Sequence, residues 1–348
     1  MPQAQRVRRS VGVALAIVYS LALFLIVGEV ATRALGLLDR LTGSSRDLYV
    51  ATDLPDLPYR LNPGVTIDAG GSAVHINGFG LRGREIAAQP VAGVERILVI
   101  GDSIIYGQGV ADDETFPVQL QRELRDRGRR VEVLNGGVPG CNNAAELAFL
   151  RAYGLALHPR RVVLGISLND FGETPVISQA GILTTDVSRR MDPDRWMPVS
   201  EFWVLLQWTA KYAGSSHWYQ GGGRGAGQDM KEVAGKLISY RHRRYYEKPQ
   251  RSSWQRVTSA MRGIRDLCSE RALPLLVVIF PESYQKGAAD TQPQERWMTL
   301  CSELDIECID LWPAFDAAGG NLYLGTQHHT PAGLGVAARV VGDALVEG

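Results

Sequence analysis

Short apolar strands that alternate with helices constrain the fold of this chain more than any other feature of its sequence. From Glu95 onward, runs such as Arg96–Ile100 have the apolar, β-branched composition of buried strands. The predicted strands cover residues 96–100, 130–134, 162–166, 275–280 and 306–310, and the predicted helices cover 116–127, 143–157, 254–271, 294–304 and 331–345. Because strands of this kind are covered by helices on both faces, the pattern predicts an α/β domain with a doubly wound parallel sheet.

Composition bounds the class of protein. The 348 residues exceed one typical domain, so one large domain with appendages or two modest domains are expected. Hydrophobic residues at 45% and charged residues at 21% argue against a disordered, collagen-like or coiled-coil chain. The 37 basic and 37 acidic residues cancel, which gives no electrostatic case for nucleic-acid binding. Four scattered cysteines leave one disulfide possible, and the absence of CxxC or HExxH motifs predicts neither a metal nor a cofactor.

An uncharged run of eighteen residues lies near the N-terminus, at positions 11–28. With its flanks it roughly matches the ~30 Å hydrocarbon core of a bilayer. Three basic residues precede it, Arg6, Arg8 and Arg9. By the positive-inside rule, residues 1–34 are predicted to form a cytoplasmic N-terminus and a transmembrane anchor, with the following domain periplasmic or extracellular. A cleaved signal peptide is the alternative, but residues 29–33 offer no clean cleavage site.

Two further segments flank or interrupt the alternating pattern. Residues 35–94 are polar and rich in Gly and Pro, with a turn signal at Asn77-Gly78, and predict an irregular β-rich lead-in that packs on the domain at 95–348. An insertion at about 172–253 contains four tryptophans, Trp196, Trp203, Trp208 and Trp218. It could form a lid or a substrate platform, because aromatic faces stack on sugar rings or acyl chains. Alternatively, its tryptophans pack on its own helix at 201–212.

Within this insertion, a glycine-rich stretch at 221–227 neither ends in GKS or GKT nor follows a strand, so phosphate binding is not predicted. We expect it to be a flexible loop. A basic cluster follows at 241–244.

Polar and glycine residues follow the predicted strands where a site is expected. The first strand is followed by Gly101-Asp102-Ser103, the second by a loop ending at Gly140, and the third by a turn containing Asn169. His328 and His329 lie just before the last helix. Because the carboxyl ends of parallel strands meet at one edge, these residues are expected to lie together. A hydroxyl, a backbone N–H, an amide and an imidazole are the groups that acyl transfer needs.

Four blocks of sequence, GDSIIYGQG, NGGVPG, SLND and HHTPAG, carry Ser, Gly, Asn and His in that order. In sequence and spacing they resemble the signature of the SGNH, or GDSL, hydrolase superfamily. The resemblance extends from about residue 96 to the C-terminus, with the insertion as its variable part. It implies a three-layer α/β/α, flavodoxin-like fold and a metal-free hydrolase acting on esters. The apolar lead-in also resembles that of membrane-anchored bacterial members.

The resemblance implies a role for each matched residue. Ser103 matches the nucleophile, whose hydroxyl needs an adjacent base. His328 matches that base, since it lies five residues before Gly333 as the family histidine lies before its glycine. His329 is the competing candidate for the base. The oxyanion hole would consist of the backbone N–H groups of Ser103 and Gly140 and the side chain of Asn169.

One position departs from the family pattern. The family usually has an aspartate three residues before the catalytic histidine, and Gly325 stands there. Such a carboxylate orients the histidine and stabilises its imidazolium form. Three possibilities remain open: a Ser103–His328 dyad oriented by a backbone carbonyl, a carboxylate supplied from elsewhere such as Asp310 or Asp170, or a degenerate site.

The sequence therefore predicts a membrane-tethered serine esterase or acyl hydrolase that acts on an ester-bearing lipid, glycan or small molecule. Its expected partners are this substrate and the membrane, without nucleic acid. One alternative is an acyltransferase that modifies an envelope polysaccharide, because a sugar hydroxyl can resolve the same acyl-serine. Another is a non-catalytic glycan-binding module that retains the pocket.

Overall fold

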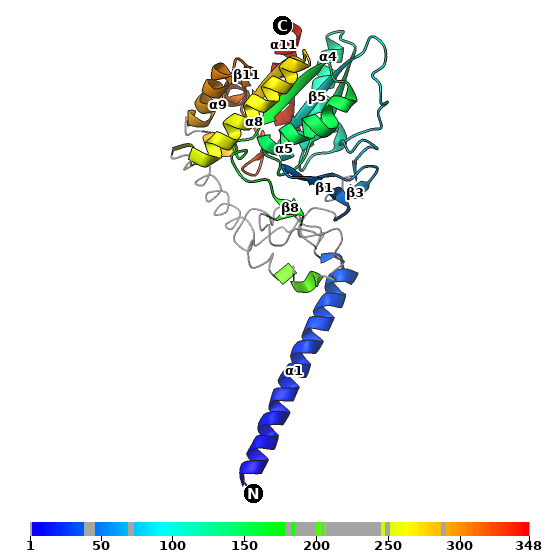
Figure 1. The fold of residues 1–348 in the computed structure, drawn as a ribbon, viewed down its shortest axis with the longest axis vertical. Coiled ribbons are helices and arrows are strands. Elements are labelled where there is room, and N and C mark those ends of the chain that lie inside the picture. Colours follow the sequence, from blue (N-terminus) through cyan, green and yellow to red (C-terminus); the bar gives the residue numbers. More distant parts are fainter. Residues whose placement is uncertain are drawn as a thin grey trace.

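A five-stranded parallel sheet forms the centre of the molecule (Figure 1). The computed structural model describes residues 2–37, 46–68, 73–177, 183–184, 200–203, 205–206, 245–247, 251–286 and 290–347. The strands are β5 (Glu95–Gly101), β6 (Val131–Gly137), β7 (Arg161–Ile166), β10 (Leu275–Ile279) and β11 (Glu307–Asp310), in the spatial order β11-β10-β7-β5-β6. Every neighbouring pair is parallel. The predicted doubly wound α/β fold is thus confirmed.

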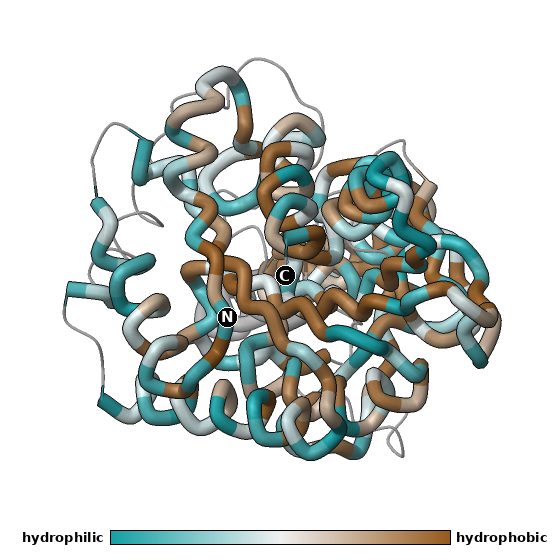
Figure 2. The backbone as a smooth tube through the Cα atoms, turned by 90° about the horizontal axis from the view of Figure 1, so that it is seen from above, coloured by the Kyte–Doolittle hydropathy of each residue, from teal (hydrophilic) through white to brown (hydrophobic). Residues whose placement is uncertain are grey.

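Helices cover both faces of this sheet. One face carries α5 (Asn143–Phe149), α8 (Arg251–Glu270) and α9 (Gln292–Glu303), and the other carries α4 (Phe116–Asp126), α10 (Trp312–Ala318) and α11 (Pro331–Glu347). Successive side chains of β5 alternate between the two cores: Leu98 and Ile100 enter the first, and Ile97 and Val99 the second. Figure 2 shows the hydrophobic strands inside the ring of more hydrophilic helices.

The helix predicted at 143–157 changes its hydrogen bonding along its length. After α5 the chain continues as a π-helical turn, Leu150–Gly154, and a 3₁₀ turn, Leu155–Leu157. The change coincides with close packing on the sheet, since a Cβ on Gly154 would lie 2.9 Å from Leu98 Cδ2. The helical segment therefore has the predicted extent but not a uniform α-helical pattern.

The lead-in forms two hairpins on the main domain. One pairs β1 (Tyr49–Leu54) with β2 (Leu57–Leu61), and the other pairs β3 (Thr66–Asp68) with β4 (Ala73–His75). The turn predicted at Asn77-Gly78 follows. There, Asn77 Oδ1 accepts the backbone N–H groups of Phe79 and Leu81, and an antiparallel bridge joins Ile76 to Arg82. A second bridge joins Arg82 to Asn135 of β6 and so attaches the lead-in to the sheet.

Helix α1 (Pro2–Ala34) projects away from the domain (Figure 1). Its segment Gly12–Ala34 contains an 18-residue stretch with a mean hydropathy of 2.4 and no buried residue, and is long and apolar enough to cross a membrane. Among the described residues it is the one helix with these properties. Near its end, Glu29 accepts hydrogen bonds from Ser200 Oγ and from the backbone N–H groups of Glu201 and Phe202.

Most of the predicted insertion lies outside the described residues. The undescribed part includes residues 221–227 and 241–244 and three of the four tryptophans; Trp203 is described and is exposed. Within the insertion, β8 (Val176–Ile177) pairs with β9 (Leu183–Thr184).

The disulfide that the sequence left possible is absent. All four cysteines are described and are free thiols, namely Cys141, Cys268, Cys301 and Cys308.

Candidate active site

The turn between β5 and α3 (Ser103–Tyr106) presents Ser103 at the carboxyl edge of the sheet. Asp102 caps this short helix, since its Oδ1 accepts the backbone N–H of Ile104 at 2.8 Å. Gly101 allows α3 to approach the sheet closely: a Cβ there would lie 2.4 Å from Ile105 Cγ1. The tight turn thus holds the serine hydroxyl at the edge, as in a nucleophile elbow.

Ser103 and His328 are brought into direct contact. Ser103 Oγ lies 3.0 Å from His328 Nε2, which is hydrogen-bonding distance. His328 belongs to β13 (His328–His329), which pairs with β12 (Tyr323–Leu324) just before α11. An unprotonated Nε2 at this position can accept the proton of the hydroxyl.

His329 points into the core instead. It is 2% exposed, and its Nε2 donates to the carbonyl oxygen of Pro281 at 2.8 Å. Burial lowers the pKa of His329 to about 3, so its imidazole is neutral at physiological pH. Phe280, Phe315 and Tyr323 surround its ring. Its neutral, packed imidazole is suited to a structural role.

Gly140 and Asn169 lie in the turns after β6 and β7, the two strands that flank β5. They therefore share the sheet edge with Ser103. Among the described residues, neither the backbone N–H of Gly140 nor the side-chain amide of Asn169 has a hydrogen-bond partner. The sequence predicts both groups as donors to an oxyanion, and neither is used by another group in this part of the chain.

The two carboxylates proposed from the sequence as partners of His328 serve other groups. Asp310 Oδ1 accepts the backbone N–H of Trp312 at 2.9 Å, and Asp170 Oδ2 accepts that of Ser167 at 2.9 Å. Within the described part of the chain, neither is hydrogen-bonded to His328.

Glu282 is a further carboxylate, one that the sequence analysis missed. It is fully buried in the loop after β10. The residue after it, Ser283, donates its backbone N–H to Thr326 O at 3.0 Å. The residue before it, Pro281, accepts a hydrogen bond from His329 at its carbonyl oxygen. The backbone that carries Glu282 therefore runs along the loop that carries His328. The signal was its place after a strand, where site residues of open α/β sheets are found.

Gly325 stands where the family usually has its aspartate, and its surroundings leave space for a side chain. A Cβ at this position would meet no atom within 4 Å. The backbone has φ +69°, however, which most L residues avoid. Asp and Asn tolerate this region better than most side chains.

Three buried carboxyl groups lie near the site, those of Asp102, Glu146 and Asp170. Burial raises the pKa of Asp102 to about 6 and that of Glu146 to about 8. Burial also raises the pKa of Asp170, with Glu146 and Asp102 adding to the effect. Each group is more readily protonated in the folded chain than in the unfolded chain.

A doubly wound sheet with a serine and a histidine in contact at its carboxyl edge is the arrangement of serine-dependent acyl hydrolases. The chain belongs to the GDSL-like Lipase/Acylhydrolase family, whose model matches residues 99–334. Members of this family hydrolyse esters. The family identified from the four sequence blocks is thereby confirmed.

The chain is also similar, at low identity, to solved structures. The lipase/acylhydrolase from Enterococcus faecalis is 13% identical, with a TM-score of 0.40 over 72% of this chain and 95% of its own. The psychrotrophic esterase EstA from Pseudoalteromonas sp. is 10% identical, with a TM-score of 0.39 over 73% of this chain and 97% of its own. No match was found among curated proteins.

The raised pKa of Glu146 predicts a pH-dependent stability. Its contribution is constant below the unfolded-state pKa of 4.5 and decreases as the pH rises to about 8, because ionising the buried carboxyl then costs free energy. Glu146→Gln should therefore gain stability over wild type progressively between these pH values. Urea unfolding of the detergent-solubilised chain measures this, with the exposed Glu303→Gln as control. A difference independent of pH would contradict the prediction.

Proposed function

We propose that the chain is a membrane-tethered serine esterase or acyl hydrolase in which Ser103 is the nucleophile and His328 the base. The observation that carries this proposal is the 3.0 Å contact between Ser103 Oγ and His328 Nε2. The serine hydroxyl is a weak nucleophile unless a base takes its proton. Membership of a family of lipases and acylhydrolases supports the assignment.

In the first half of the reaction, Ser103 Oγ attacks the ester carbonyl carbon while His328 Nε2 takes the hydroxyl proton. The carbonyl oxygen gains negative charge, and the N–H groups of Ser103 and Gly140 and the amide of Asn169 stabilise it. One such donor is typically worth about 3 to 4 kcal/mol. When the intermediate collapses, the C–O bond to the alcohol breaks, and His328 returns the proton to the departing oxygen.

In the second half, water attacks the acyl-serine as His328 takes one of its protons. Collapse then releases the carboxylic acid and restores the Ser103 hydroxyl. A sugar hydroxyl in place of water would give acyl transfer by the same steps. The products formed in the presence of a hydroxyl acceptor distinguish the two activities.

The membrane tether in this proposal is α1. Its exposed apolar segment, Gly12–Ala34, supports a span, and the arginines before it support a cytoplasmic N-terminus. The catalytic domain then lies outside the cytoplasm. Ester-bearing lipids, glycans and small acyl compounds are the substrate classes within its reach.

A fluorophosphonate probe tests the nucleophile, because an activated serine hydroxyl displaces its fluoride and becomes phosphonylated. Wild type should be labelled and Ser103→Ala should not, because Ser103 is the hydroxyl in contact with a base. In-gel fluorescence of the full chain in detergent measures this. A folded wild-type chain that resists labelling would refute the enzyme assignment and favour a glycan-binding module.

The neighbouring histidines provide a matched pair for the base. His328→Gln should lower the labelling rate by at least about a hundredfold, since general bases contribute 10²–10⁴-fold. His329→Gln should affect mainly the thermal midpoint, because this ring contacts Pro281 and core aromatics. Rates per folded protein separate the effects, and the reverse order would assign the base to His329.

The carboxylate that orients His328 is open to a direct comparison. We expect Glu282→Gln to lower kcat at least about tenfold, and more than Asp170→Asn or Asp310→Asn, because Glu282 comes from the backbone that runs along the histidine loop. Steady-state kinetics with a small activated ester measure this. Wild-type kcat in Glu282→Gln together with a large loss in Asp170→Asn would show that Asp170 serves instead.

A rescue experiment completes this comparison. Gly325→Asp, placed in the Glu282→Gln background, should recover part of kcat and raise the pKa of His328 in the pH–rate profile, because an anion stabilises the imidazolium. The matched Gly325→Asn carries the same backbone strain without the charge. Equal rates for the two would refute a carboxylate requirement at this position.

The topology follows from α1. A reporter enzyme that works only outside the cytoplasm, fused after residue 348, should be active, and the chain should resist carbonate extraction. Activity of a reporter that works only in the cytoplasm would reverse the orientation. A mature chain beginning at about residues 31–37 would show instead that the segment is a cleaved signal.

A further inference from the structure

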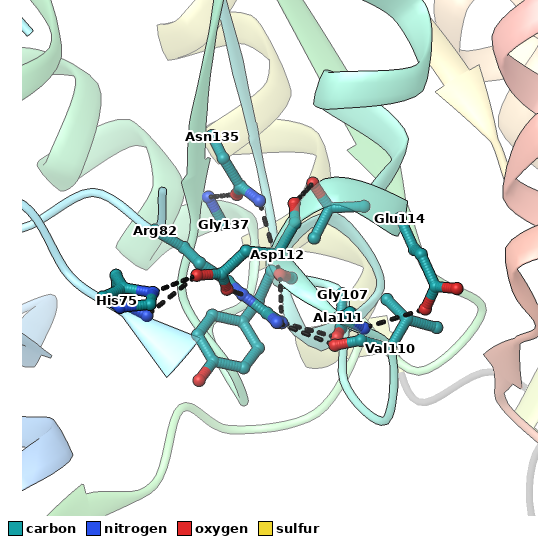
Figure 3. Close-up of polar contacts among 11 residues, drawn as sticks. His75, Arg82, Gly107, Val110, Ala111, Asp112, Glu114, Asn135 and Gly137 are labelled. Atoms are coloured by element: carbon teal, nitrogen blue, oxygen red, sulfur yellow. Dashed lines mark hydrogen bonds and ion pairs between the residues drawn. The ribbon is translucent and has the colours of Figure 1, made fainter. Parts of the chain in front are cut away.

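Arg82 belongs to the lead-in, yet its guanidinium binds the chain that follows Ser103, at Gly107 and Val110 (Figure 3). The residue is 4% exposed. It donates to three backbone carbonyl oxygens at the end of α3 and in the loop after it: Tyr106 at 3.0 Å, Gly107 at 2.6 Å and Val110 at 2.7 Å. One charged group thus fixes both sides of that loop.

The charge of Arg82 is fully compensated. Its Nε donates to Asp112 Oδ1 at 2.8 Å, and its guanidinium lies 4.7 Å from the centre of the Tyr106 ring. Asp112 Oδ2 is itself 2.7 Å from His75 Nδ1 and accepts the backbone N–H of His75 (Figure 3). This compensation suits a fixed structural element better than a site for an anionic ligand.

The loop held by Arg82 contacts Ser103 directly and is connected to His328 through Leu324. At its beginning, the backbone N–H groups of Gly107 and Gln108 donate to the carbonyl oxygen of Ser103 at 3.1 and 3.0 Å. At its tip, a Cβ on Gly109 would lie 3.1 Å from Leu324 Cδ1. Leu324 pairs with His328 across β12 and β13. A displacement of this loop would therefore change the separation of the serine and the histidine.

We propose that Arg82 is a positioning residue that sets the distance between Ser103 Oγ and His328 Nε2. This inference rests on the function proposed above. The planar guanidinium presents several donors in a fixed fork, and a lysine ammonium in its place would act as a point charge. Misplacement of reacting groups by about 1 Å can cost about 10²-fold in rate. The lead-in is accordingly a working part of the catalytic unit.

Arg96 provides the matched control for a test in the full chain. It is also buried, at 0% exposed, and also ties the lead-in to the sheet, through the carbonyl oxygen of Ala87 at 2.8 Å. Its other partners include Leu157 O and Glu132. It lies at the start of β5, whereas Ser103 follows the end of that strand.

Arg82→Lys and Arg96→Lys are compared in detergent for thermal midpoint, kcat, KM and the fluorophosphonate labelling rate. We expect similar losses of midpoint. Arg82→Lys should lower kcat and the labelling rate at least about tenfold with little change in KM, whereas Arg96→Lys should keep both rates. Equal rates per folded protein in the two variants would overturn the proposal.

Amide hydrogen exchange gives a second measurement that does not depend on activity. Peptides covering 103–110 and 323–329 should exchange faster in Arg82→Lys than in wild type and Arg96→Lys. Unchanged protection of both segments would overturn the positioning role even if the wild-type chain proved inactive, an outcome that on its own refutes the proposed function. If Arg82→Lys does not fold, Asp112→Asn, which removes the ion pair but keeps the arginine, is compared by the same criteria.

Discussion

The contact between Ser103 and His328 joins residues 225 positions apart in the chain, and the rest of the site depends on how the fold creates it. Ser103 follows β5, which lies between β7 and β6, and His328 lies in β13, which the chain reaches after β11, α10 and β12. A parallel sheet brings its carboxyl ends to one edge, but this fixes positions only to within several ångströms. Short elements then set the final separation of the Ser103 and His328 side chains: α3 after Gly101, and the β12–β13 pair before α11.

The buried carboxyl groups near the site have a cost in the stability of the folded chain. Asp102, Glu146 and Asp170 are fully buried carboxyl groups, and burial raises the pKa of each. Among the residues that the structure describes, Asp170 Oδ1 and Glu146 Oε1 have no hydrogen-bond partner. Groups of this kind are retained in active-site regions more often than in ordinary cores. The low dielectric constant of such buried surroundings also strengthens the interaction of nearby N–H donors with an oxyanion.

Periodicity and strand-end position were enough to predict much of this molecule. The five strands are apolar runs in the sequence. Ser103 was predicted from its place after the first of them, and His328 from its place before the last helix and its spacing to Gly333. The same rule applied after β10 would have found Glu282, which a proline separates from the strand-like run. Helix α3 escaped prediction because four residues are too few to show a helical period.

Arg82 could not be predicted in the same way, for a physical reason. Its partners are backbone carbonyl oxygens and a carboxylate about 25 to 30 positions away. Every residue has a backbone carbonyl, so the residue types in the sequence do not indicate which carbonyl oxygens an arginine will bind. An arginine in a polar, glycine-rich stretch has the composition of a solvent-exposed loop. Only the turn predicted at Asn77 indicated that the chain reverses its direction before Arg82. The two bridges of Arg82 show that it pairs with Ile76 and with Asn135 of β6.

The order of α1, the hairpins, Arg82 and β5 along the chain explains how the lead-in connects α1 to the site. Helix α1 ends at Ala34, the hairpins begin at Tyr49, Arg82 holds the loop after the nucleophile, and β5 starts at Glu95. The lead-in is therefore at once the covalent link to α1 and the support of Ser103. A chain shortened to begin at Glu95 keeps every family block but loses Arg82, and with it the donor for three carbonyl oxygens and the partner of Asp112. A buried acceptor left without its donor costs about 1 to 3 kcal/mol, so removing the lead-in would destabilise the site as well as separate it from α1.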